Sequence, residues 1–555
     1  MRFLYIRFLI VTYFFLNGKE YFFMRKNPYQ LFMIEVVLFL CMAGIIMRLY
    51  AVSHGTQAAE AGIRQGKYHL HIQLSSGTVY DRNMIPLNQS EEAVYAVVTP
   101  TPDAVASVYA KIADRDALKE HLQKKAPFLC RLTGMPAANE NVILLRGTEK
   151  PAGTLPAQHL LGYQQNGKAV AGLEAAYSEW LGACSTSADL TFSVDANGGV
   201  LAGAEQSNLI TGAQGGGIVT TLQAEIQQIA EDALAQAERA GAVVVMNCRT
   251  GELAACASTP VYDPDHLAEA LERDDAPFVN RALSAYSVGS VFKLVTAAAA
   301  LENGFNPRYM FSCSGEITVR GQRFRCHKRD GHGLLNMQQA LIQSCNPYFI
   351  SLSRLLTPEM MHDTAEAFGF GTETVLANEL CGAAGYLPSV RELQIEAEKA
   401  NMSFGQGKLL ATPVQIAAMT ACIANNGIYL PPILIRGLTA DGKKLIPSEA
   451  EAQHRAVSEK TAKYLRRMMT AVIGQSKTTK GKPSNVRAAG KTSTAQTGQF
   501  DENGDEYCHA WMTGFFPVSQ PEYAVTVLIE KGGSGNDAAA PVFRSVIEQI
   551  TDLQS

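Results

Sequence analysis

Ser290 and Lys293 lie three residues apart in the segment YSVGSVFK at 286–293, which precedes an apolar run at 294–301. This spacing puts a hydroxyl and an amine on one helix face, one turn apart. An amine beside a hydroxyl can activate it as a nucleophile when the amine is neutral. Burial and the positive end of a helix dipole both lower a lysine pKa and so favour the neutral form. Because such pairs are common, an N-cap serine beside a solvated lysine is the alternative interpretation.

Two later stretches contain groups that complement this pair. Ser344 and Asn346 follow a helical pattern at 337–343, and Lys491 lies in a strand-like segment at 489–498. A glycine-bearing turn, SFGQG at 403–407, lies between them and precedes a further helix that starts near Pro413. Each motif alone favours an ordinary turn, capping or solvated position. Together, in this order, they predict one site.

The order S-x-x-K, then S-x-N about 50 residues later, then K-T-x about 145 residues further on, resembles the penicillin-binding protein and serine β-lactamase superfamily. Similar landmarks continue at 221–234, 241–263, 280–283 and 510–517, and upstream GTVYDRN at 77–83 resembles the start of the pedestal of class B enzymes. The likeness covers residues from about 70 to about 545. The chain is identified as a member of the class B penicillin-binding proteins, which are monofunctional peptidoglycan D,D-transpeptidases.

The resemblance implies acyl transfer between peptidoglycan stem peptides through a serine acyl-enzyme, with β-lactams as covalent inhibitors. It implies Ser290 as nucleophile, Lys293 as its base, Ser344 as a proton relay and Asn346 as a group that holds both lysine and substrate. Lys491 adds positive charge that keeps Lys293 neutral and attracts the donor carboxylate. It also implies that the substrate binds along the strand at Thr492, Ser493 and Thr494. The backbone N–H groups of Ser290 and Thr494 would form the oxyanion hole. No cofactor or metal is expected.

Three positions depart from the family pattern. Ser493 replaces the glycine of K-T-G, which predicts altered β-lactam affinity rather than loss of activity. Ser76 replaces an arginine and Met84 a glycine in the upstream motif. Those two changes affect the local contacts of the pedestal and not the chemistry.

The bulk composition predicts a multidomain protein. The chain has 555 residues, of which 47% are hydrophobic, and a net charge of −4. It has no basic tract of the kind that nucleic-acid-binding proteins carry, so nucleic acid is excluded as the main partner. We expect an α+β pedestal or dimerisation-type domain at 51–215, followed by a transpeptidase domain at 216–555 with an antiparallel sheet flanked by helices.

The N-terminal region predicts a single membrane anchor. Residues 31–50 are apolar and long enough to cross a bilayer. Arg25 and Lys26 precede them, which places residues 1–30 in the cytoplasm and the catalytic domain outside the cell membrane. A cleavable signal is the alternative. Met24 followed by two basic residues resembles a natural start, so 1–23 is read as an over-extended gene start.

The eleven cysteines are dispersed, without a C-x-x-C motif. Cys313 and Cys326 flank a predicted hairpin whose turn contains Gly321, and either a disulfide or two reduced thiols fits this pattern. Cys345, inside S-x-N, is expected to pack away from the cleft.

Two other functions use the same motifs. One is a hydrolase, either a D,D-carboxypeptidase or a β-lactamase. The other is a non-catalytic β-lactam sensor or scaffold. By family analogy the enzyme works beside the lipid bilayer with a membrane glycosyltransferase. The sequence does not separate elongation, division and sporulation roles.

Overall fold

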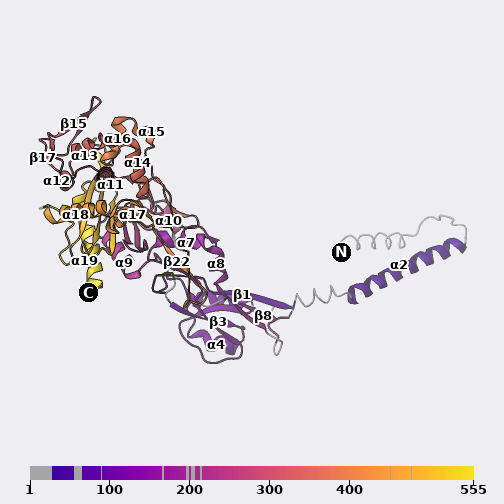
Figure 1. Ribbon diagram of the computed structural model, residues 1–555. Helices are drawn as coiled ribbons and strands as arrows, with labels where there is room; N and C mark the ends of the chain where they lie inside the picture. The colour runs from indigo at the N-terminus through magenta and orange to yellow at the C-terminus, as the bar shows by residue number, and fades with distance from the viewer. Residues whose placement is uncertain are drawn as a thin grey trace. The chain divides into compact units, whose positions relative to one another are not determined.

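The computed structural model describes residues 28–54, 66–88, 91–124, 126–165, 168–195, 199–201, 207–212, 215–449, 452–476 and 478–555 (Figure 1). The chain divides into two units, one containing the N-terminal helix α2 (Pro28–His54) and the other containing residues 70–118, 128–189 and 208–555. Helix α2 includes an apolar stretch, Phe32–Ala51, that is long and apolar enough to cross a membrane. The predicted gene-start error at 1–23 lies outside the described residues.

The segment before residue 216 contains a small antiparallel sheet with the order β4-β3-β5. Its strands are β3 (Glu91–Val98), β4 (Phe128–Leu132) and β5 (Val142–Glu149), and α4 (Pro102–Tyr109) covers one face through Ala104 and Val108. The remaining elements of this segment are α5 (Arg115–Lys124), α6 (Gln158–Leu161), α7 (Gly172–Ala176), α8 (Ser178–Ala183), β1 (Lys67–Ser75), β6 (Gln164–Gln165), β7 (Lys168–Ala169), β8 (Thr186–Ser193) and β9 (Ser207–Thr211).

The upstream GTVYDRN motif is joined to the segment after residue 216. Strand β2 (Thr78–Tyr80) pairs in parallel with β10 (Gly217–Thr220), which pairs on its other side with β22 (Ile435–Thr439). The carboxylate of Asp81 accepts hydrogen bonds from the backbone N–H groups of Asn83 and Ile85, which closes the turn after β2. Met84 in this turn has a φ of 65°, a conformation that glycine adopts without strain. This geometry explains why the family pattern has glycine there.

The main sheet is antiparallel, as predicted, and it has five strands in the order β12-β11-β27-β26-β25. Its strands are β11 (Gly241–Asn247), β12 (Leu253–Thr259), β25 (Ala489–Phe500), β26 (Glu506–Phe516) and β27 (Tyr523–Ile529). The continuous apolar run at 242–246 is fully buried because helices cover both faces of the sheet. Strand β25 lies at the end of the sheet, so one of its edges has no neighbouring strand in this sheet.

Two layers of helices enclose this sheet (Figure 1). On one face α9 (Ala224–Ala235) packs beside the C-terminal helix α19 (Ala540–Leu553), with Ile226 and Phe543 in the shared core. On the other face lie α11 (Lys293–Glu302), α17 (Pro413–Ala424) and α18 (Glu459–Gln475). Every residue of α17 is buried, and a capping box between Thr412 and Gln415 fixes its start.

The remaining elements after residue 216 lie outside the main sheet. They are α10 (Leu267–Leu271), β13 (Tyr286–Ser287), η1 (Gly289–Phe292), β14 (Phe311–Cys313), β15 (Glu316–Val319), β16 (Gln322–Arg325), β17 (Gly333–Leu335), α12 (Met337–Ile342), α13 (Asn346–Ser353), α14 (Pro358–Ala367), β18 (Thr374–Ala377), β19 (Leu380–Gly382), α15 (Val390–Leu393), α16 (Glu396–Ser403), β20 (Leu410–Ala411), β21 (Ile428–Tyr429), β23 (Leu445–Pro447), β24 (His454–Arg455) and η2 (Gly535–Ala539).

Candidate active site

Ser290 lies in η1, a short 3-10 turn that leads into α11. The sequence predicts a helical turn here, and the structure has a tighter one before the α-helix begins at Lys293. Gly289 starts the turn with a φ of 63°, and its backbone N–H donates to the carbonyl of Gly405 at 2.7 Å. A Cβ atom at position 405 would clash with the carbonyl oxygen of Gly289. The two glycines therefore let the SFGQG turn lie directly against the nucleophile turn.

Lys293 is fully buried, with an exposed fraction of 0%. Its Nζ lies 2.9 Å from Ser290 Oγ and donates to two acceptors at 2.7 Å, the carbonyl of Ser344 and Oδ1 of Asn346. A neutral amine has two N–H groups and one lone pair. The two acceptors match those N–H groups, so the lone pair is left for Ser290.

Burial lowers the pKa of Lys293 well below its ordinary value, and the nearby charge of Lys491 lowers it further. Burial also lowers the pKa of Lys491 to about 7. The charge of Lys491 thus disfavours protonation of Lys293, in the direction that the sequence analysis expects.

The hydroxyl of Ser344 connects Ser290 with the two lysines of the site. Its Oγ donates to Ser290 Oγ at 2.9 Å and lies 3.2 Å from the Nζ atoms of both Lys293 and Lys491. Ser344 has a φ of 50°, in the left-handed region, and Asn346 begins α13 two residues later. The S-x-N turn is thereby shaped so that both side chains reach Lys293.

Lys491 approaches from β25 and also donates to the carbonyl of Thr492 at 2.7 Å. Its exposed fraction is 1%, so it acts from beneath the cavity wall. Ser493 is buried, and its Oγ donates to the carbonyl of Val288 at 2.9 Å. Thr494, next along the strand, is exposed. The alternation of a strand thus directs the hydroxyl of Ser493 toward the nucleophile turn and exposes its neighbour.

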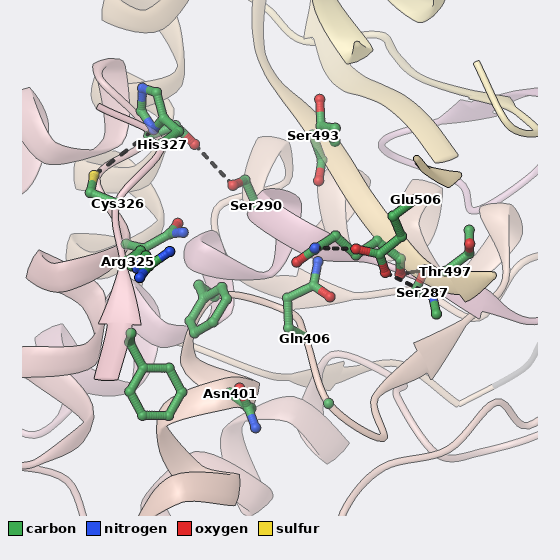
Figure 2. A pocket seen from close by; sticks show the side chains of 18 of the residues that line it. Ser287, Ser290, Arg325, Cys326, His327, Asn401, Gln406, Ser493, Thr497 and Glu506 are labelled. Carbon is green, nitrogen blue, oxygen red and sulfur yellow. Dashed lines mark hydrogen bonds between the residues drawn. The ribbon is translucent and has the colours of Figure 1, made fainter. Parts of the chain in front are cut away.

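A cavity of about 1160 Å³ lies above these groups. Figure 2 shows Ser290 between the segment that carries Cys326 and His327 and the strand that carries Ser493 and Thr497. The structure brings together all eight residues that the sequence motifs predict, since six line the cavity and the two lysines lie beneath them; the six are Ser290, Ser344, Asn346, Thr492, Ser493 and Thr494.

Sequence reasoning missed part of this lining. Gln406 and Gln496 lie within the SFGQG turn and the segment at 489–498, so both stretches were noted, but neither side chain was predicted to belong to the site. Glu506 reaches the cavity from β26, where its carboxylate accepts a hydrogen bond from the side-chain amide of Gln496. No local sequence signal indicates this position. The hairpin residues Arg323 and Arg325 add positive charge to the opposite wall.

Known proteins are similar to this chain over the same region. A family model described as "Penicillin binding protein transpeptidase domain" matches residues 241–548. Peptidoglycan D,D-transpeptidase PbpA of Mycolicibacterium smegmatis is 33% identical over 362 residues, which cover 60% of this chain and 72% of that protein. Stage V sporulation protein D of Bacillus subtilis is 29% identical over 518 residues, covering 86% and 78%.

Solved structures agree with these sequence matches. A ceftriaxone acyl-enzyme complex of penicillin-binding protein A from M. tuberculosis has a TM-score of 0.61 and 26% identity, covering 73% of this chain and 93% of that one. A D,D-transpeptidase domain from Eggerthella lenta, with a TM-score of 0.64, 24% identity and coverage of 87% and 99%, has the same fold. The family model matches more than half of the chain. The chain therefore belongs to the penicillin-binding protein transpeptidase family, in the class B branch.

Proposed function

We propose that this protein is a peptidoglycan D,D-transpeptidase that cross-links stem peptides through an acyl-enzyme on Ser290. The main support for this proposal is the environment of Lys293. Its buried Nζ contacts the Oγ of Ser290 and two groups that can only accept hydrogen bonds, the carbonyl of Ser344 and Oδ1 of Asn346. A buried neutral amine within hydrogen-bond reach of a hydroxyl is the arrangement that general-base activation requires. The proposed substrate is a stem peptide that ends in D-Ala-D-Ala.

In the first step Ser290 Oγ attacks the carbonyl carbon of the penultimate D-Ala, and its proton passes to Lys293 Nζ. The carbonyl oxygen becomes an oxyanion, which backbone N–H groups of Ser290 and Thr494 stabilise. The C–N bond then breaks and the terminal D-Ala leaves as an amine. Ser344 Oγ, in contact with both Ser290 and Lys293, relays the proton to that amine.

In the second step the amine of a neighbouring stem peptide attacks the ester carbonyl. The ester C–O bond to Ser290 breaks as a new amide bond forms, and Ser290 recovers its proton from the amine through the same relay. Asn346 holds Lys293 in place throughout, and Lys491 supplies charge that keeps the Lys293 amine neutral. The donor peptide pairs with the outer edge of β25, where Thr492 and Thr494 face the terminal carboxylate.

The relatives support this substrate class. PbpA of M. smegmatis is named a peptidoglycan D,D-transpeptidase, and penicillin-binding protein A of M. tuberculosis has been solved as a penicillin G acyl-enzyme. By the same chemistry, β-lactams acylate Ser290 here. Hydrolases share the first step, and they differ by rapid transfer of the acyl group to water.

We propose further that α2 anchors the protein in the cell membrane, with its N-terminus in the cytoplasm and the catalytic domain outside. The apolar stretch Phe32–Ala51 supports the anchor, and Arg25 and Lys26 support the orientation. Residues 51–215 serve as a pedestal for the transpeptidase domain at 216–555. A membrane glycosyltransferase that polymerises the glycan strands is the proposed partner.

Fluorescent penicillin tests the proposed function on the detergent-solubilised full chain. We expect a stable covalent band that is lost in Ser290→Ala and slowed by at least about 100-fold in Lys293→Met, the range that loss of a general base gives. Ser284→Ala is the matched control, since its Oγ donates to the carbonyl of Asn280 and lies outside the cavity lining.

Two outcomes would contradict this function. Label that turns over rapidly would indicate a β-lactamase. Label that persists in Ser290→Ala would place the nucleophile elsewhere. A lipid-linked peptidoglycan assay with a separate glycosyltransferase then distinguishes cross-linked product from trimmed stem peptides, which a carboxypeptidase would give.

A further inference from the structure

Three cysteines and one histidine converge directly behind the S-x-N turn. Cys313 ends β14, Cys326 follows β16, His332 precedes β17, and Cys345 is the central residue of S-x-N. The ligand atoms of all four side chains lie within 4.8 Å of one another. Residues distant in the sequence thus place four potential metal ligands around one point.

The distances fit tetrahedral coordination. Cys326 Sγ lies 3.5 Å from His332 Nδ1. In a tetrahedral zinc site, with Zn–S near 2.3 Å and Zn–N near 2.0–2.1 Å, a sulfur and a nitrogen are about 3.6 Å apart. The sulfur of Cys345 forms hydrogen bonds with the sulfurs of both Cys326 and Cys313. All three sulfurs therefore already face a common centre.

The surroundings also suit bound thiolates. The three cysteines are at most 2% exposed. Backbone N–H groups of Lys328 and Asn346 donate to the sulfur of Cys326. His332 Nε2 is buried without a hydrogen-bond partner in the part of the chain that the structure describes, so hydrogen bonding to that nitrogen does not explain the placement of the ring. The two backbone N–H groups that donate to Cys326 are the kind of hydrogen bond that is characteristic of the outer shell of metal sites.

A disulfide accounts for less of this geometry. It would join two sulfurs and leave the third thiol and the imidazole unused. The structure has Cys313, Cys326 and Cys345 as free thiols. The sequence left open whether Cys313 and Cys326 pair, and it treated Cys345 only as a packing residue.

We propose that Cys313, Cys326, His332 and Cys345 bind one structural Zn²⁺ ion that fixes the S-x-N turn of the active site. Three thiolates and one imidazole form a closed ligand set, which is typical of structural rather than catalytic zinc. On binding, each thiol loses its proton to solvent and the complex carries one net negative charge. The positive charge of Lys328 acts on His332 and offsets part of that negative charge.

The proposed ion lies next to the chemistry without taking part in it. Cys345 is bonded to Ser344 on one side and to Asn346 on the other. Ser344 has a φ of 50°, a conformation that costs a non-glycine residue about 1 kcal/mol or more. A metal bond to Cys345 holds the turn between these two residues, so both keep their contacts with Lys293.

Metal analysis of the full chain, purified in detergent under reducing conditions, tests the proposal. We expect about one zinc per chain by elemental analysis. After chelation, added Co²⁺ should give a thiolate-to-cobalt charge-transfer band and the intense visible bands of tetrahedral cobalt. Chelation should also lower the thermal unfolding midpoint, and added Zn²⁺ should restore it.

Matched variants locate the site. Cys313→Ser and Cys326→Ser should lose stoichiometric zinc, whereas Cys422→Ser, a buried free cysteine in α17, should keep it. The cobalt spectrum of the wild-type chain decides the matter even where a variant fails to fold. Three results would overturn the proposal: wild type that holds no zinc and gives no cobalt band, zinc that persists in both variants, or a disulfide between Cys313 and Cys326 in the native protein. None of these results depends on the proposed transpeptidase activity.

Discussion

The hydroxyl of Ser493 on β25 donates a hydrogen bond to the carbonyl of Val288, 2.9 Å away and two residues before Ser290. Val288 is fully buried, so Ser493 is the partner of a carbonyl that water cannot reach. A Cβ atom at Gly289 would clash with Ser493 Oγ. Where the family pattern has glycine, this chain has a direct bond between the K-T-x strand and the nucleophile turn.

Ser493→Gly should slow acylation of Ser290 and destabilise the fold. An unpaired buried carbonyl costs about 1–3 kcal/mol, and about 1 kcal/mol of this in the transition state corresponds to a roughly fivefold slower rate. Second-order acylation rates with fluorescent penicillin and thermal unfolding measure both effects. Ser493→Ala keeps the Cβ atom and loses only the hydroxyl, so it separates the effect of the hydrogen bond from the effect of the Cβ atom. Equal acylation rates for wild type and Ser493→Gly would contradict the prediction.

Acylation should become faster as pH rises, because Ser290 is activated only by the neutral amine of Lys293. Lys491→Met removes a positive charge that lowers the Lys293 pKa, so the acidic limb of the pH–rate profile should move to higher pH. Profiles of acylation rate between pH 5 and 10, roughly the range over which perturbed lysines titrate, measure the shift. Lys460→Met, at an exposed lysine, is the control. A limb that moves to lower pH or stays in place would rule out this coupling.

Gly405→Ala should destabilise the domain by several kcal/mol and abolish acylation. The added Cβ meets the backbone of Gly289, which cannot move without displacing Ser290. Gly498→Ala is the matched control, since Gly498 has a φ of 71° but open space around its Cβ position. That variant should cost only about 1 kcal/mol of backbone strain. Denaturant unfolding compares the two, and similar losses for both would show that the clash is relieved.

Met84→Gly should stabilise the protein by up to about 1 kcal/mol, because it removes left-handed strain in the turn after β2. The gain is limited by the greater chain entropy of unfolded glycine. Met84→Ala keeps a Cβ atom, and therefore the strain, so it should not show the gain. The thermal unfolding midpoint is the measurement. A lower midpoint for Met84→Gly than for Met84→Ala would mean that the methionine side chain contributes packing that outweighs its strain.

Sequence motifs selected residues that the fold does bring together, because each of these groups lies on a short element with a clear local pattern. Ser290 and Lys293 start a helix, Ser344 and Asn346 flank a helix start, and Lys491 lies on an alternating strand. The antiparallel sheet was also predicted and is confirmed. Periodicity and order sufficed for these features.

Long-range contacts were beyond that reasoning. Nothing local to Glu506 indicates that it reaches the cavity, because its position follows from the register of β25 against β26. The sequence reasoning considered Cys313 and Cys326 as a pair and Cys345 as a packing residue, gave His332 no role, and did not connect the four. Their convergence depends on how the hairpin of β15 and β16 folds back toward α13, which spacing alone does not determine.

The close contact between Gly289 and Gly405 also limits how the protein can evolve. Under β-lactam selection, a change in the shape of the cavity near the nucleophile would be an advantage. A side chain at Gly289 would displace Ser493, however, and one at Gly405 would displace the backbone of Gly289 beside Ser290. Resistance through a larger residue at either of these two positions is therefore excluded. Tolerated variation is left to residues such as Gln406 and Thr497, whose side chains already line the cavity and leave the backbone turn intact.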